Sequence, residues 1–318
     1  MTASPPPTGP PVWKIAAVLC LGIAAVATAA IWVRLSIAAM PSAVRAASGF
    51  GLGFGSWFAL ARLTIAAVLL LPKWPAVLRS RREGRTVGAF GWAIAAGACL
   101  GLHFALWLSS LSYTSIAAAT VLVTSNPLWI ALLGWWCFGD RPTAWSFGGI
   151  GIALAGSAAI ALSGAVPTAI AGQPALGNLL ALLGAWAVSA YLLLGRTAQR
   201  RGLTLAEYST IAYASAATLL LPVPALFGAS YTAYPLPVFG YVLLSALLPQ
   251  LVGHTAINWS VRWVSPTIVT LAVLFEPLIS TTLGIWMFDE VPSPTMAIGA
   301  IVMLGGVVLA IVAQPRRV

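Results

Sequence analysis

The chain has 318 residues, of which 60% are hydrophobic and only 7% charged, and its mean hydropathy is +0.96. Soluble domains carry about 25% charged residues, so this composition excludes a water-soluble globule and predicts an integral membrane protein. The formal net charge of +10 would suggest nucleic acid in a soluble chain, but here we attribute it to cytoplasmic loops and expect no nucleic-acid partner.

The first segment, residues 1–12, is rich in proline and is predicted to be disordered. A cleaved signal peptide is normally followed by a soluble chain, whereas apolar runs continue here, so the first run is predicted to remain as a helix. A membrane-spanning helix needs about 20 apolar residues. We predict an all-α fold with ten such helices, at 13–40, 53–72, 87–111, 115–139, 143–163, 176–196, 207–228, 236–259, 264–288 and 294–313. Residues 314–318 remain as a C-terminal tail.

Lysine and arginine side chains predict the orientation of these helices. With a cytoplasmic N-terminus, nearly all of them fall on the cytoplasmic side, and only Arg34 and Arg45 lie near the outer face. The outer loops at 163–175, 229–235 and 289–293 carry neither residue type. Both termini are therefore predicted to be cytoplasmic, and the protein is predicted to lie in the plasma (inner) membrane of a bacterium.

The sequence contains an internal repeat at an offset of 150 residues, in which SIAAATVLVTSNPLWIALLGWWCFGD at 115–140 matches SPTIVTLAVLFEPLISTTLGIWMFDE at 265–290. The aligned pairs are Asn126-Pro127 with Glu276-Pro277, Gly134 with Gly284, Asp140 with Glu290, Gly149 with Gly299, and Gly156 with Gly306. The repeat divides the ten predicted helices into two halves of five, at residues 13–163 and 176–313. Because five is odd, the second half enters the membrane from the opposite side, so the halves are predicted to be repeats of inverted topology. Such repeats hold substrate near the membrane midplane and alternate access by rocking one half on the other.

The two halves, each with a Pro-Leu pair, a later acid and a glycine-spaced helix, resemble the drug/metabolite transporter superfamily. Its ten-helix EamA-type exporters are the nearest match. Arg62 in FALARLTIAAVLLL also looks like the arginine that this family often has in its second helix. The resemblance implies a transporter with helices 1, 3, 4, 6, 8 and 9 around a central cavity. It implies export of amino acids most often, aromatic ones included as in YddG-type exporters, and it is specific for fold but not for substrate.

Arg62 and Glu276 both lie near the middle of predicted helices. An arginine at the bilayer centre costs about 2.5–3.5 kcal/mol on insertion scales, so Arg62 either pairs with Glu276 or holds backbone carbonyls within its own half. Glu276 fits three roles: it binds a substrate ammonium, it carries a proton that drives transport, or it bonds backbone freed by Pro277. Pro127 and Pro277 are predicted helix breaks or hinges.

Other polar residues inside the predicted helices are further candidates. The amide of Asn126 can bind a substrate carboxylate or a carbonyl left unpaired beside the proline. His103 faces the cavity in the family layout, or makes an interhelical hydrogen bond. Gln250, His254 and Asn258 recur at four-residue spacing and predict a polar stripe, which lines a vestibule or joins helices.

Three deep tryptophans predict either an aromatic cavity lining or ordinary packing: Trp107, Trp129 and Trp186. Three others are predicted at the membrane interfaces: Trp13, Trp74 and Trp263. The cysteines lie in apolar runs and are predicted to be small buried side chains: Cys20, Cys99 and Cys137. The two histidines are scattered, and no Walker, HExxH or nucleophile motif occurs, so we expect no metal, no cofactor and no enzyme.

The leading hypothesis is therefore a secondary transporter that exports small metabolites, amino acids first, by alternating access, with protons as a possible coupling ion. Efflux of drugs or quaternary cations is the alternative within transport, and a non-transporting membrane scaffold is the alternative outside it. Two repeats in one chain supply both halves of a cavity, so a monomer would suffice.

Overall fold

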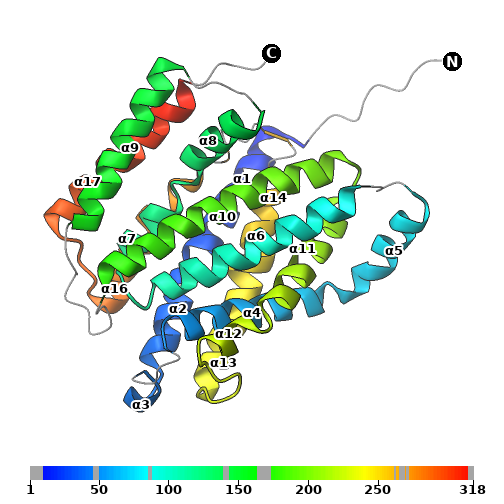
Figure 1. Cartoon of the computed structure of the whole chain (residues 1–318), viewed down its shortest axis with the longest axis horizontal. Helices are drawn as coiled ribbons and strands as arrows, with labels where there is room; N and C mark the ends of the chain where they lie inside the picture. The colour runs from blue at the N-terminus through cyan, green and yellow to red at the C-terminus, as the bar shows by residue number, and fades with distance from the viewer. Residues whose placement is uncertain are drawn as a thin grey trace.

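The computed structural model describes residues 10–45, 50–84, 88–138, 143–162, 173–260, 263–264, 269 and 272–313, and these residues form helices and the turns between them, without a strand (Figure 1). Of the expectations above, the disorder of residues 1–9, the tail at 314–318 and the acid Asp140 fall outside this part of the chain.

The helices of the first half are α1 (Val12–Ala27), α2 (Ala29–Ala38), α3 (Ser42–Arg45), α4 (Leu52–Leu69), η1 (Leu71–Lys73), α5 (Trp74–Arg82), α6 (Ala89–Ser110), α7 (Ile116–Val123), α8 (Asn126–Phe138) and α9 (Ala144–Leu162). The second half contains α10 (Pro174–Arg200), α11 (Leu205–Leu220), α12 (Val223–Leu226), α13 (Leu236–Ser245), the π-helical η2 (Ala246–His254), α14 (Thr255–Ser260), α16 (Glu276–Phe288) and α17 (Pro294–Val312).

Seven helical stretches in the described part are long and apolar enough to cross a membrane. They are Val12–Ala38, Leu52–Leu69, Ala89–Ser110, Ile116–Leu133, Pro174–Arg200, Leu205–Leu226 and Leu236–Ser260. α9 and α17 contain shorter apolar helices, and the predicted segment 264–288 is described only in part. The all-helical membrane class agrees with the sequence, while the count of ten and the cytoplasmic placement of both termini stay predictions.

The predicted helices at 115–139 and 264–288 are interrupted just before Pro127 and Pro277, the residues predicted as helix breaks or hinges. α7 ends at Val123 and α8 begins at Asn126, directly before Pro127. α16 likewise begins at Glu276, directly before Pro277. Proline has no backbone N–H and fits the first turn of a helix, so each proline starts a new helix after the break.

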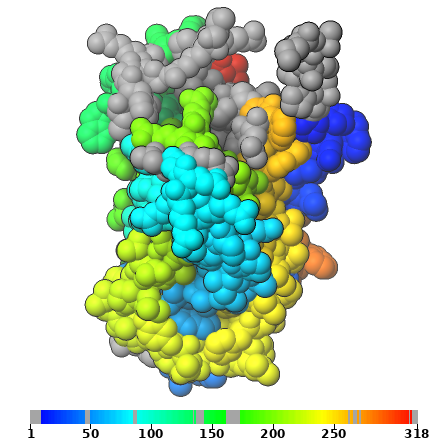
Figure 2. Space-filling view, turned by 90° about the vertical axis from the view of Figure 1, so that its right-hand side faces the viewer, coloured from blue at the N-terminus to red at the C-terminus, as the bar shows by residue number. Residues whose placement is uncertain are grey.

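α4 lies inside the bundle, packed against α6, α11, α12, α13 and η2. In the space-filling view it is seen only as a small blue area between the yellow-green and yellow segments (Figure 2). Its buried face includes Phe54, Phe58 and Leu63, together with Arg62.

Cys20 was predicted to be buried, but the structure exposes it on α1. A small apolar side chain in this position can face lipid.

α9 and α17 pack closely against each other at one side of the molecule (Figure 1). The contact is made by the glycines that the repeat aligns. A Cβ added at Gly149 would lie 2.7 Å from the carbonyl oxygen of Gly306, and one added at Gly156 would lie 2.7 Å from that of Gly299. The absence of side chains at these glycines therefore lets the two backbones approach.

We expect Gly156→Ala to lower the free energy of unfolding by about 1–3 kcal/mol, because the methyl group meets the backbone of α17 and overpacks the contact. The neighbouring Gly151 has no heavy atom within 4 Å of an added Cβ. Gly151→Ala is thus the matched control, and thermal unfolding of the two purified variants in detergent is the measurement. Equal melting temperatures would contradict the assigned packing.

Candidate functional site

A cavity of about 720 Å³ lies among α1, α6, α7, α8, α10, α14, η2 and the start of α16. These elements correspond to the predicted helices 1, 3, 4, 6, 8 and 9, as the family resemblance implied. Leu203 and Tyr208 add to the wall from the α10–α11 region. The cavity is large enough for a small metabolite, since ligand sites commonly measure about 300–1,000 Å³.

Several side chains singled out in the sequence line this cavity together, among them His103, Trp107, Asn126, His254 and Glu276. They come from four different helical regions, and the fold therefore gathers residues that are up to 173 positions apart. His103, Asn126, His254 and Glu276 were singled out because a polar group deep in an apolar helix has to face protein or water.

His103 is buried and is held by α10. Its Nδ1 lies 2.9 Å from the carbonyl oxygen of Gly184. A carbonyl oxygen only accepts, so Nδ1 donates the proton of this bond. The imidazole also stacks on Trp107, with ring centres 5.9 Å apart and an interplanar angle of 9°. His103 thus makes the interhelical bond and lines the cavity at the same time.

Asn126 and Glu276 occupy equivalent places at the first residues of α8 and α16. The backbone carbonyl of Asn126 accepts a bond from the Ser189 hydroxyl at 3.0 Å, while its side-chain oxygen is buried without a hydrogen-bond partner. The indole N–H of Trp107 is also buried without a hydrogen-bond partner. Buried polar atoms are normally bonded, so these two atoms are candidates for polar contacts with a ligand, beside the carboxyl group of Glu276 in the cavity wall.

Sequence reasoning missed Tyr191, which is buried in the cavity wall. Its hydroxyl accepts a bond of 3.1 Å from the Asn258 side-chain amide, and its ring stacks on Tyr208 with centres 6.1 Å apart. Tyr191 lies seven residues after Gly184 on α10, and this helical spacing was the available signal. Of the predicted polar stripe, His254 and Asn258 line the cavity, whereas Gln250 does not.

The far end of the cavity is basic. Arg196, Gln199 and Arg200 line it at the C-terminal end of α10, beside Trp263. Trp263 was predicted only as an interface residue. This end also has the more exposed lining residues, so we call it the mouth of the cavity.

Arg62 takes neither of its two predicted roles. It is 0% exposed and donates from Nε to the Gln250 side-chain oxygen at 3.0 Å, across the boundary between the two halves. Its guanidinium carbon lies 4.1 Å from the centre of the Phe104 ring. Among the described residues, Nη1 and Nη2 have no hydrogen-bond partner and Glu276 forms no ion pair with it.

Trp129 and Trp186 are not part of the cavity wall. They pack on each other, with ring centres 4.9 Å apart, and Trp186 is 50% exposed. The prediction of an aromatic lining therefore applies to Trp107 alone of the three deep tryptophans. An all-round apolar helix does not specify which of its tryptophans turn inward.

The chain is similar to a known protein family and to solved structures. The profile of the EamA-like transporter family matches residues 13–162 and 175–312. Among curated proteins none matches. One solved structure, titled only as the crystal structure of a protein, is 18% identical, with a TM-score of 0.58 over 96% of this chain and 99% of its own length. At this identity the likeness shows the fold alone.

We expect Gln250→Glu to raise the melting temperature. The substitution keeps the size of the side chain and gives Arg62 a charged acceptor, and charge-assisted hydrogen bonds are about twice as strong as neutral ones. Gln250→Met, which leaves Nε of Arg62 without its acceptor, should instead cost about 1–3 kcal/mol. Thermal unfolding of both variants is the measurement, and equal destabilisation by both would contradict this account of Arg62.

Proposed function

The chain belongs to the EamA-like transporter family, and from this premise we propose that it exports small metabolites, amino acids first and aromatic ones included. As a member of a transporter family it moves a small-molecule substrate across a lipid bilayer. We propose export by alternating access, with the two halves as inverted repeats, both termini in the cytoplasm of a bacterium and one chain as the working unit.

The chemistry of the cavity wall carries this proposal. An amino acid has an ammonium group, which needs acceptors, and a carboxylate, which needs donors. Glu276 and the unpartnered oxygen of Asn126 supply acceptors at the helix breaks. The unpartnered indole N–H of Trp107 supplies a donor, and the N-terminus of α8 adds positive potential nearby. The rings of Trp107, Tyr191 and Tyr208 then suit an aromatic side chain.

Glu276 is also the group that would couple transport to protons. It is buried in the cavity wall, and no described cation forms an ion pair with it. A carboxyl group in this position can exchange a proton for a cationic substrate group, because a buried site does not hold both charges at low cost. A proton gradient would then drive export.

A second candidate is the efflux of quaternary cations. It is favoured by one observation, which is that the cavity combines an acid with aromatic rings, as sites for such cations do. The two candidates differ in the need for a carboxylate on the substrate, and hence in the role of the Trp107 indole N–H as a donor.

The test is flux in liposomes. We expect saturable uptake of radiolabelled phenylalanine or tryptophan into vesicles with reconstituted protein, stimulated by a pH gradient. Glu276→Gln should lower this flux about tenfold to a hundredfold, because a hydrogen bond to a charged group contributes about 1.5–3 kcal/mol, and should remove the response to the gradient.

Asp289→Asn is the matched control, since Asp289 is an exposed acid beyond the end of the same helix. Protein-free vesicles set the background. Flux of a cationic dye without flux of any amino acid would replace the first candidate with the second. Absence of both, with folded protein, would reject transport of these substrate classes.

A further inference from the structure

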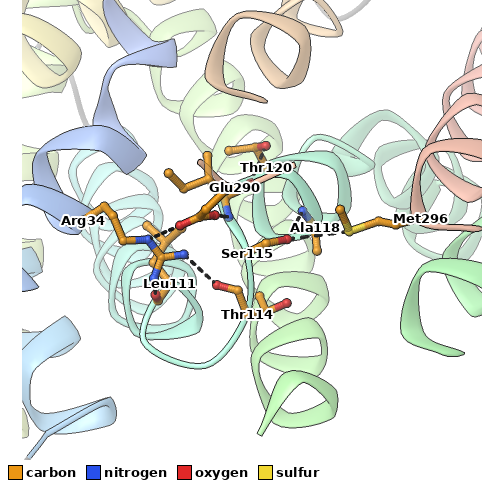
Figure 3. A network of polar contacts seen from close by, with 9 residues as sticks. Arg34, Leu111, Thr114, Ser115, Ala118, Thr120, Glu290 and Met296 are labelled. Atoms are coloured by element: carbon orange, nitrogen blue, oxygen red, sulfur yellow. Dashed lines mark hydrogen bonds and ion pairs between the residues drawn. The ribbon is translucent and has the colours of Figure 1, made fainter. Parts of the chain in front are cut away.

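A second polar centre lies away from the cavity and joins an arginine to an acid (Figure 3). The Nε atom of Arg34 is 2.7 Å from Oε1 of Glu290. The two terminal nitrogens of Arg34 donate to backbone carbonyls, Nη1 to Leu111 at 2.7 Å and Nη2 to Thr114 at 3.0 Å. Oε2 of Glu290 in turn accepts from the backbone N–H of Ile116 at 2.8 Å.

This centre is closed to solvent and ties several elements together. Arg34 is 1% exposed and Glu290 is 3% exposed. The contacts connect α2, the 111–115 turn, the first residue of α7 and the segment after α16. The hydroxyl of Thr114 also bonds the side-chain oxygen of Asn178 at 2.9 Å, which adds α10. Elements from both halves of the chain therefore meet here.

α10 shows where this centre lies relative to the cavity. Asn178 is near the N-terminal end of α10, and Arg200 is at its C-terminal end and at the mouth of the cavity. With a rise of about 1.5 Å per residue, the two lie roughly 33 Å apart along the helix, which is about the thickness of the hydrocarbon layer. The Arg34–Glu290 pair thus belongs to the end of the molecule opposite the mouth.

Two of the tied elements also carry the cavity residues. α7 begins at Ile116, whose backbone N–H donates to Glu290, and the chain continues from α7 through a short turn to Asn126 at the start of α8. α16 begins at Glu276 in the cavity wall and ends just before Glu290. A further bond from Ser280 to the carbonyl of Ala27, at 2.9 Å, links α16 to α1. α7 and α16 thus run between the helix breaks at the cavity and the elements that hold the pair.

We propose that Arg34 and Glu290 are positioning residues for transport: they latch the end opposite the mouth, and they separate when the cavity opens on that side. This proposal rests on the alternating access proposed above. The pair is a buried ion pair that joins the two halves of the chain.

An ion pair suits a latch that has to open. Its Coulomb attraction is largely offset by the desolvation of both charges. When water enters, both groups are solvated, and the free-energy difference between closed and open stays small. An apolar plug of the same size would expose hydrophobic surface on opening and would hold the end shut. The backbone bonds to Leu111, Thr114 and Ile116 give the closed form a single geometry.

The test measures access to the latch without any substrate. Ser112 lies in the latched turn, is buried, and its hydroxyl has no hydrogen-bond partner. Ser112→Cys is therefore a probe that removes no bond. It is placed in full-length protein lacking Cys20, Cys99 and Cys137, in nanodiscs, with a hydrophilic maleimide reaching both faces. The rate of labelling reports the fraction of open molecules.

We expect slow labelling of this probe in the parent protein. Glu290→Gln, which removes the charge but keeps an acceptor for Ile116, should speed it about tenfold or more. Arg34→Lys, which keeps the charge but cannot make all three contacts, should give a smaller increase and serves if Glu290→Gln does not fold. Asp289→Asn, the adjacent exposed acid, should have no effect.

Ser80→Cys separates latch opening from general loosening. Ser80 is also buried with an unpartnered hydroxyl, but it lies on α5, away from the latch. The proposal is wrong if Glu290→Gln and Arg34→Lys leave labelling of Ser112→Cys unchanged, or if they speed both probes by the same factor. Neither result depends on flux, so failure of the transport proposal would be recognised separately, in liposomes.

Discussion

Compensation of buried charge is the constraint on which the rest of this structure depends. Among the charged or ionisable side chains that are almost fully enclosed are Arg34, Arg62, Glu276 and Glu290. In hydrocarbon each would be costly alone. Arg34 and Glu290 neutralise each other and bind the backbone around them. Arg62 relies on Gln250 and an aromatic ring. Glu276 lies in the cavity wall without an ion-pair partner among the described residues, which is why we propose it as the acid for a ligand or a proton.

The helix breaks explain why the chemistry is concentrated at the middle of the molecule. A continuous helix satisfies all its backbone groups and leaves nothing for a ligand. At Pro127 and Pro277 a new helix begins after a turn, so the unbroken series of i→i−4 backbone bonds is lost there. Asn126 and Glu276 are the first residues after those breaks. The same prolines therefore create the need for polar partners and position them.

The sequence was informative about depth and much less so about direction. Composition predicted the membrane class, and polar residues at mid-helix predicted His103, Asn126 and Glu276 at one cavity. The facing of Trp186 and the partner of Arg62 could not be predicted, because helices that are apolar all round have no amphipathic face to orient them. In η2 the π-helical turn further changes the spacing, so Gln250 faces Arg62 while His254 faces the cavity.

The repeat makes the difference between the two ends meaningful. Arg34 and Arg196 are 162 positions apart, like Gly22 and Gly184, and this spacing predicts equivalent places for the two arginines in the two halves. In the structure Arg34 is enclosed in an ion pair, whereas Arg196 lines the mouth of the cavity. A twofold scaffold at rest in its symmetric form would give both arginines the same surroundings. Their different surroundings describe a molecule closed at one end and open at the other. If the halves exchange conformations, the two arginines exchange environments, and one sequence motif then serves in turn as latch and as mouth.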